Sequence, residues 1–213
     1  MRPLDDRFAA AVDLATEAGA LALRMRPAPG TLTATLKGAQ DWLTEADGAV
    51  EHFLSERLAA RFPADGFQGE EGGKARHGTL RWVVDPIDGT ANYARGRSRF
   101  CISLALLEDR TPLIGVLVAP ALGETFAARL GGGATLNGAA IRAAETTQLS
   151  RALVEVGWSH RRPTSIFTAL LQRVIEAGAH VSPFLDGDGP ERGNPILACA
   201  PGIAAELTRI VEK

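Results

Sequence analysis

The chain has 213 residues, of which 46% are hydrophobic and 23% charged, and its formal net charge is −2. This length allows one large domain or two small ones with a buried core, and the composition is that of a globular protein. The nearly neutral charge argues against a surface for a nucleic-acid polymer, which needs a basic excess. The sequence has no apolar run of membrane-spanning length and no signal-peptide pattern, so we expect a cytoplasmic protein without membrane contact.

The first part of the chain predicts two amphipathic helices. Apolar residues recur at helical spacing over residues 4–25 and again over 44–62, and each run stops before a proline. Between them, residues 31–36 are Thr-rich and fit either a strand or an extended loop. The second helix opens with Thr44-Glu45-Ala46-Asp47, which has the form of a capping box.

A strand-rich region follows the two helices. Short β-prone runs joined by polar turns predict an antiparallel meander, with strands over 80–84, 100–107, 113–119, 123–128 and 134–136. The glycines at 131–133 fit a hairpin turn better than a phosphate-binding loop, because no Lys-Ser/Thr pair follows them. Two helices on one side of such a sheet predict a layered α+β fold.

The last third of the chain has a different character. It predicts short strands over 152–156, 181–185 and 196–200, and helices over 163–177 and 201–211. We therefore place a boundary after residue 145, with an N-terminal α+β metal-binding subdomain over 1–145 and a C-terminal α/β subdomain over 146–213. Cys101 and Cys199 each lie in an apolar segment, which favours buried thiols over a disulfide or a metal-binding pair.

The run Asp85-Pro86-Ile87-Asp88-Gly89-Thr90 carries the strongest chemical signal. A buried strand delivers the first aspartate, Gly89 allows a sharp turn, and Thr90 stands where a helical turn could begin. Two carboxylates this close repel each other unless a cation lies between them, and oxygen ligands, the Ile87 carbonyl among them, select Mg²⁺ or Mn²⁺. The alternative is an Asp-Gly turn that merely caps a helix.

Other acidic residues have two interpretations each. Glu70-Glu71 lies in a glycine-bounded turn and is either a solvated loop or a metal ligand that also activates water. Asp47 fits a helix cap, an acid held beside the site, or both at once. Lys37 and Asp41 lie in the preceding loop, where Lys37 is either a neutralising charge or a solvent lysine. The four histidines have no metal-binding spacing.

Together these residues resemble a known family. Gly69-Glu70-Glu71 and the run from Trp82 to Tyr93 look like the signature of the inositol monophosphatase family. Its members are Mg²⁺-dependent, lithium-sensitive phosphomonoesterases with a layered α-β-α-β-α sugar-phosphatase fold. Supporting segments occur in the family's order and cover most of the chain: 37–47, 102–120, 132–138, 193–195 and 201–207.

The resemblance implies a role for each site residue. Glu70, Asp85 and the Ile87 carbonyl would hold a first metal, and Asp85 and Asp88 would share a second. Glu70 and Thr90 would position the attacking water, with Asp47 supporting the water network. Asp88 and the Gly89 and Thr90 amides would take the substrate phosphate. The implied substrate is a small phosphorylated metabolite of the inositol-phosphate, histidinol-phosphate or 3′-phosphoadenosine type, and a homodimer is compatible with the resemblance.

One departure from the family affects the predicted activity. The family carries a later Trp-Asp-x-Ala-Ala motif whose aspartate completes the second metal site, but Trp42, Trp82 and Trp158 are not followed by aspartate. A single Glu176-Ala177-Gly178 stands where members often have two such segments, so we infer an internal deletion between about Leu170 and Val181. The C-terminal half is then shortened, and we expect weak or absent turnover. The alternatives are a non-catalytic metal- or phosphate-binding descendant and a nonfunctional deletion product.

Overall fold

The structure is a computed structural model and describes residues 4–28, 34–38, 41–72 and 75–147, together with Pro163 and Ser165. The chain divides into two compact units, Met1–Ile141 and Arg142–Lys213. All elements described below belong to the first unit. The strands and helices predicted after residue 150, Cys199 and the inferred deletion lie outside the described residues apart from Pro163 and Ser165, so they stay predictions, as do the two subdomains and their roles.

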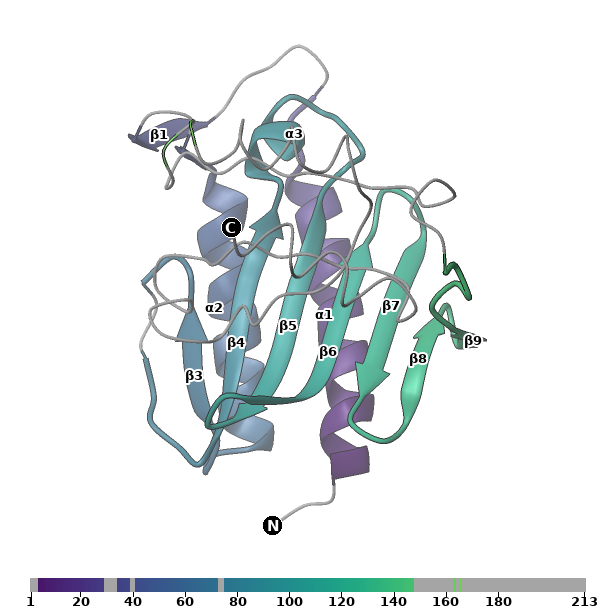
Figure 1. The fold of residues 1–213 in the computed structure, drawn as a ribbon. Helices are drawn as coiled ribbons and strands as arrows, with labels where there is room; N and C mark the ends of the chain where they lie inside the picture. Colours follow the sequence, from purple (N-terminus) through teal and green to yellow (C-terminus); the bar gives the residue numbers. More distant parts are fainter. Residues whose placement is uncertain are drawn as a thin grey trace. The chain divides into compact units, whose positions relative to one another are not determined.

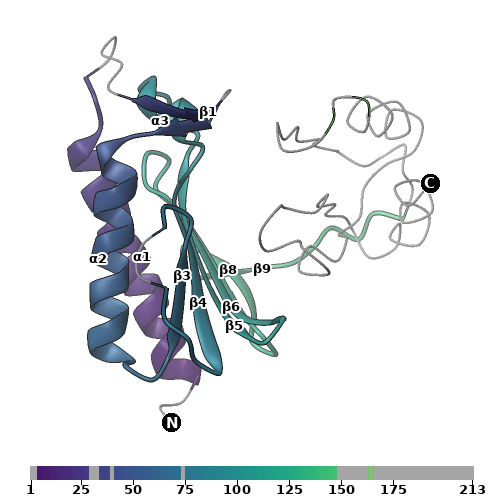
Figure 2. The ribbon, with the colours of Figure 1, turned by 90° about the vertical axis from the view of Figure 1, so that its left-hand side faces the viewer.

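The two predicted helices are confirmed. α1 spans Leu4–Met25 and α2 spans Glu45–Arg61. α1 buries a stripe of small residues, Ala10, Ala11, Ala15, Ala18 and Ala22, which lets its backbone approach the sheet closely. Figure 2 shows both helices on the same side of the sheet. Among the described residues, we find no helix with both the length and the apolar character needed to cross a membrane.

Within the described residues, the main sheet has seven strands in the order β3-β4-β5-β6-β7-β8-β9 (Figure 1). Their bounds are Gly66–Gly69 for β3, Leu80–Asp88 for β4, Cys101–Glu108 for β5, Thr111–Ala119 for β6, Glu124–Arg129 for β7, Gly133–Leu136 for β8 and Ala139–Ile141 for β9. A separate antiparallel hairpin joins β1, Thr35–Gly38, to β2, Asp41–Leu43, so the Thr-rich segment ends in a strand. The predicted turn at glycines 131–133 is confirmed, since it links β7 to β8.

The predicted antiparallel meander is confirmed from β4 to β8, β9 extends it by a strand that was not predicted, and the first edge of the sheet is not antiparallel. β3 was not predicted, and it pairs with β4 in parallel, with Gly69 opposite Val84. After the Glu70-Glu71 turn the chain comes back beside β3, where Arg76 forms an antiparallel bridge with Phe67, and β4 then runs in the same direction as β3. Parallel pairing therefore brings the residue that follows β3 to the same end of the sheet as the end of β4.

The core lies between the helices and one face of the sheet. Side chains alternate along β4, so Trp82 and Val84 are buried while Arg81, Val83 and Asp85 are half-buried. β5 follows the same pattern with Ile102, Leu104 and Leu106. Asp85 thus belongs to the sheet face opposite the helices, on a strand fixed by its neighbours on both sides.

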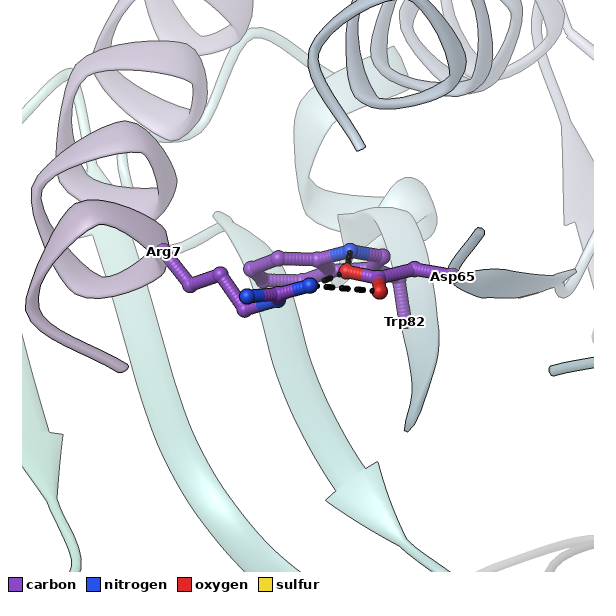
Figure 3. A network of polar contacts seen from close by, with 3 residues as sticks. All are labelled: Arg7, Asp65 and Trp82. Atoms are coloured by element: carbon purple, nitrogen blue, oxygen red, sulfur yellow. Dashed lines mark hydrogen bonds and ion pairs between the residues drawn. The ribbon is translucent and has the colours of Figure 1, made fainter. Parts of the chain in front are cut away.

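A buried polar network ties α1 to the sheet at the end remote from α3 (Figure 3). The Arg7 guanidinium donates to both carboxylate oxygens of Asp65, at 2.9 and 2.8 Å, and the Trp82 indole N–H donates to the same carboxylate at 3.1 Å. Arg7 also lies over the Phe62 ring, which stacks on Trp82. This bidentate, fully hydrogen-bonded pair locks the start of α1 onto the residues that lead into β3.

Candidate active site

The aspartates predicted as metal ligands come from the end of β4. β4 continues to Asp88, so the segment predicted as a loop is in fact the last part of a strand. The pairing with β5 is irregular there: Asp85 stands opposite Ser103, and Asp88 stands opposite Cys101. Pro86 lies inside this irregularity and cannot donate a ladder hydrogen bond, which accounts for the break. The irregularity separates the two aspartates on an otherwise rigid strand.

A glycine-dependent turn follows the strand. Gly89 has φ +90°, and a Cβ at this position would lie 3.0 Å from the Arg99 carbonyl oxygen, so both conformation and space require glycine. The short helix α3, Thr90–Ala94, begins directly afterwards, which confirms the predicted helical turn. The Thr90 hydroxyl lies 2.9 Å from the Ile87 carbonyl oxygen and 3.3 Å from Asp47 Oδ1. Its single proton can go to only one of these acceptors at a time.

Asp47 both caps α2 and contacts Thr90. Its Oδ2 accepts the Thr44 backbone N–H at 2.8 Å and also the Thr44 hydroxyl, which confirms the predicted capping box. Its other oxygen faces Thr90, and the residue is only 1% exposed. Burial raises the pKa of Asp47 above its ordinary value, although the hydrogen bonds from Thr44 and Thr90 oppose this rise.

Glu70 reaches Asp85 because of the parallel β3–β4 register. With Gly69 opposite Val84, the next residues of the two segments, Glu70 and Asp85, lie side by side, and their carboxyl groups are hydrogen-bonded. Burial, the charges of Glu70 and Asp88, and this hydrogen bond together raise the pKa of Asp85 to about 8. Without a bound cation, the Asp85 carboxyl group therefore keeps a proton that ordinary aspartates lose near pH 4.

The acidic cluster has the chemistry of a divalent-cation site. Asp85 keeps a proton because acidic groups surround it, and a hard cation with oxygen ligands can replace that proton. Glu70 and Asp85 are in direct contact, and Asp88 is near enough to act on Asp85 through its charge. Within the part of the chain that the structure describes, no three acidic, His or Cys side chains form a ready-made ligand set. The predicted ligands are thus brought together as a pair with a third acid beside it.

Two residues at the site were not predicted. The Cys101 thiol donates to Asp88 Oδ2 at 3.7 Å, and burial together with the charges of Asp88 and Asp85 raises the pKa of Cys101 to about 12. The expectation that Cys101 is a buried hydrophobe is therefore wrong: it is half-buried and faces an acidic group. Glu51 is a buried acid that accepts the Glu71 backbone N–H. It follows Asp47 by four residues on α2, a spacing visible in the sequence.

Comparison with known proteins identifies the class. The family model described as the inositol monophosphatase family matches residues 4–185. "Nus factor SuhB" of Xylella fastidiosa is 36% identical over 150 residues, covering 70% of this chain and 54% of that protein. "Inositol-1-monophosphatase" of Rhizobium meliloti is 40% identical over 132 residues, covering 61% of this chain and 49% of that protein. The chain spans about half the length of the curated relatives it matches.

Solved structures agree with this assignment. SuhB of Mycobacterium tuberculosis superimposes with a TM-score of 0.77 at 25% identity, covering 100% of this chain and 98% of that one. The Thermotoga maritima IMPase superimposes with a TM-score of 0.71 at 29% identity, covering 81% of this chain and 66% of that one. The fold is thus the layered α+β fold predicted from the sequence. The chain belongs to the inositol monophosphatase family.

Proposed function

We propose that this chain is a Mg²⁺-dependent phosphomonoesterase that hydrolyses a small phosphate monoester, with Mn²⁺ as the alternative ion and inhibition by Li⁺. The observation that carries this proposal is the contact between the carboxyl groups of Glu70 and Asp85, with Asp88 beside them. Such a cluster is stable only with a bound proton or a bound cation. Glu70, Asp85 and the Ile87 carbonyl are the proposed ligands of a first metal, and Asp85 and Asp88 those of a second.

The chain's own groups would divide the chemistry between them. Bound Mg²⁺ supplies Lewis-acid polarisation of a phosphate oxygen and lowers the pKa of an adjacent water. Glu70 orients that water from the Asp85 side, and the Thr90 hydroxyl orients it from the Asp47 side, where a buried carboxyl can exchange the Thr90 proton. Asp88 and the Gly89 and Thr90 amides face the substrate phosphate at the start of α3. No side-chain nucleophile is required.

The names of several relatives support a proposal for the substrate class. Several of these names refer to inositol monophosphates, and the name of a Thermotoga maritima protein 38% identical over 120 residues refers also to fructose 1,6-bisphosphate. We propose a phosphorylated polyol or sugar as the substrate. Turnover is expected to be weak, because the chain lacks the Trp-Asp motif that would add a third carboxylate to the second metal. The same absence favours the second candidate function, a non-catalytic Mg²⁺- or phosphate-binding protein.

The test is a phosphate-release assay across Mg²⁺ concentrations, with inositol 1-phosphate, fructose 1,6-bisphosphate, histidinol phosphate and adenosine 3′,5′-bisphosphate. The proposal expects Mg²⁺-dependent turnover that Asp85→Asn lowers at least about 10²-fold and Thr90→Ala lowers less. The matched control is Glu56→Gln, which changes an exposed acid on α2 and should leave turnover unchanged. Mg²⁺ binding without turnover would establish the second candidate instead, and robust turnover at ordinary Mg²⁺ would contradict the expected impairment.

A further inference from the structure

Glu51 is a buried acid that the proposed chemistry does not use. It is 3% exposed and lies on α2, four residues after Asp47. Residues at this spacing share a helix face, so α2 presents two acidic side chains in succession toward the sheet. Asp47 contacts Thr90, on the segment that follows β4. Glu51 contacts the segment that follows β3.

The contact of Glu51 is specific. Its Oε2 accepts the Glu71 backbone N–H at 2.7 Å. The carboxylate also lies directly over Gly69, because a Cβ at Gly69 would come within 2.1 Å of Oε2. Gly69 therefore needs to be glycine to make room for the acid, in an ordinary backbone conformation. Glu51 thus holds both sides of Glu70: the last residue of β3 and the amide of Glu71.

Glu70 lies in a turn at the edge strand of the sheet. It is exposed, and it follows a four-residue strand that pairs with β4 on one side and has a single bridge, Phe67 to Arg76, on the other. A hydrogen bond from a backbone amide to a buried carboxylate is stronger than one between neutral groups and has little freedom to rearrange. The hydrogen bond from the Glu71 amide to Glu51 links this turn to the helix layer.

We propose that Glu51 is a positioning residue, which holds the Glu70 turn against the end of β4 so that Glu70 meets Asp85 at the metal site. α2 then supports both halves of the site, with Asp47 on Thr90 and Glu51 on the Glu70 turn. This inference rests on the proposed function, since it assigns Glu51 a part in metal binding. A purely structural role predicts a different result: loss of stability without a selective loss of metal affinity.

The test compares Glu51→Met with Glu51→Gln in the full chain, by calorimetric titration with Mg²⁺ and by turnover across Mg²⁺ concentrations. Glu51→Met removes the acceptor at similar length, and should weaken Mg²⁺ binding about 10–100-fold. Glu51→Gln keeps an acceptor oxygen and should restore affinity to within about threefold of wild type. KM for the substrate at saturating Mg²⁺ should change little in either variant. Gly69→Ala, which displaces the carboxylate without altering it, should resemble Glu51→Met and serves if that variant does not fold.

The control is Leu54→Ala, which opens a cavity on the same helix at a fully buried position. It should lower thermal stability and leave Mg²⁺ affinity unchanged. The positioning role is overturned if Glu51→Met binds Mg²⁺ as tightly as wild type, or if Leu54→Ala weakens binding equally. A wild-type chain whose Mg²⁺ binding Asp85→Asn does not reduce would overturn the proposed function itself, whatever the Glu51 variants do.

Discussion

Replacing Asp85 by asparagine should stabilise the metal-free chain and abolish its stabilisation by Mg²⁺. The carboxyl group has a pKa of about 8 in the folded chain against 3.8 as the ordinary value. Because the pKa of Asp85 is higher in the folded chain than in the unfolded chain, this group contributes most to stability below pH 3.8, where it is protonated. Stability is lost progressively as the pH rises from there through about 8. Asparagine removes this ionisation and keeps the shape.

The magnitude follows from the size of the shift. One pKa unit corresponds to about 1.4 kcal/mol, so ionising Asp85 would cost up to about 4 kcal/mol at pH 7 if the cluster could not relax. Glu70 is exposed and can move away, which reduces the cost. We expect the Asp85→Asn variant to gain about 1–3 kcal/mol in metal-free unfolding free energy at pH 8, shrinking toward zero as the pH approaches 4.

The assay is thermal unfolding followed by circular dichroism, in EDTA and in millimolar Mg²⁺, across pH 4 to 8.5. Mg²⁺ should raise the melting temperature of wild type, because it binds only the folded chain, and should not raise that of Asp85→Asn. The order of the two melting temperatures should therefore reverse when enough Mg²⁺ is added. Absence of a metal-free gain at pH 8, or equal stabilisation of both proteins by Mg²⁺, would refute the reasoning.

Three further changes test other contacts. Arg7→Met should lower the unfolding free energy by about 3–5 kcal/mol in a urea titration, because Asp65 would stay buried without its cation. Adding Asp65→Asn should recover part of this loss, and equal stability of Arg7→Met and wild type would contradict the prediction. Gly89→Ala should lower the unfolding free energy by about 1–3 kcal/mol and reduce Mg²⁺-dependent turnover, because alanine would have to adopt φ +90° and fit its Cβ beside the Arg99 carbonyl. Unchanged turnover would exclude this turn from the site. In the metal-free chain, Cys101 should react with iodoacetamide at pH 8 about 10³-fold more slowly than a free thiol does, because its pKa is about 12. Mass spectrometry of the peptide that contains Cys101 measures this rate, and a rate equal to that of a free thiol would contradict the prediction.

Periodicity and local signals in the sequence predicted much of this unit. Long apolar repeats predicted α1 and α2, and Thr44 with Asp47 predicted the cap of α2. The Asp85-to-Thr90 run predicted a strand end, a glycine turn and a helical start, although the strand continues to Asp88. These features are local, since each depends on residues a few positions apart.

Pairing and buried charge could not be predicted in the same way. β3 has four residues, two of them glycine, so it lacks the alternation that marks a strand, and its parallel pairing with β4 depends on tertiary structure. Arg7 and Glu51 are isolated charges on helices, where solvent exposure is the usual state. Their burial depends on partners far along the chain: Asp65 for Arg7 and Glu71 for Glu51.

The parallel pairing of β3 with β4 has a consequence for how this unit can change in evolution. It allows the proposed ligands and their supports, from Asp47 through Glu51 and Glu70 to Asp88 and Thr90, to come from one uninterrupted stretch of chain. Such a stretch can be inherited as a module. A change elsewhere in the gene then leaves the acidic cluster encoded in a single segment.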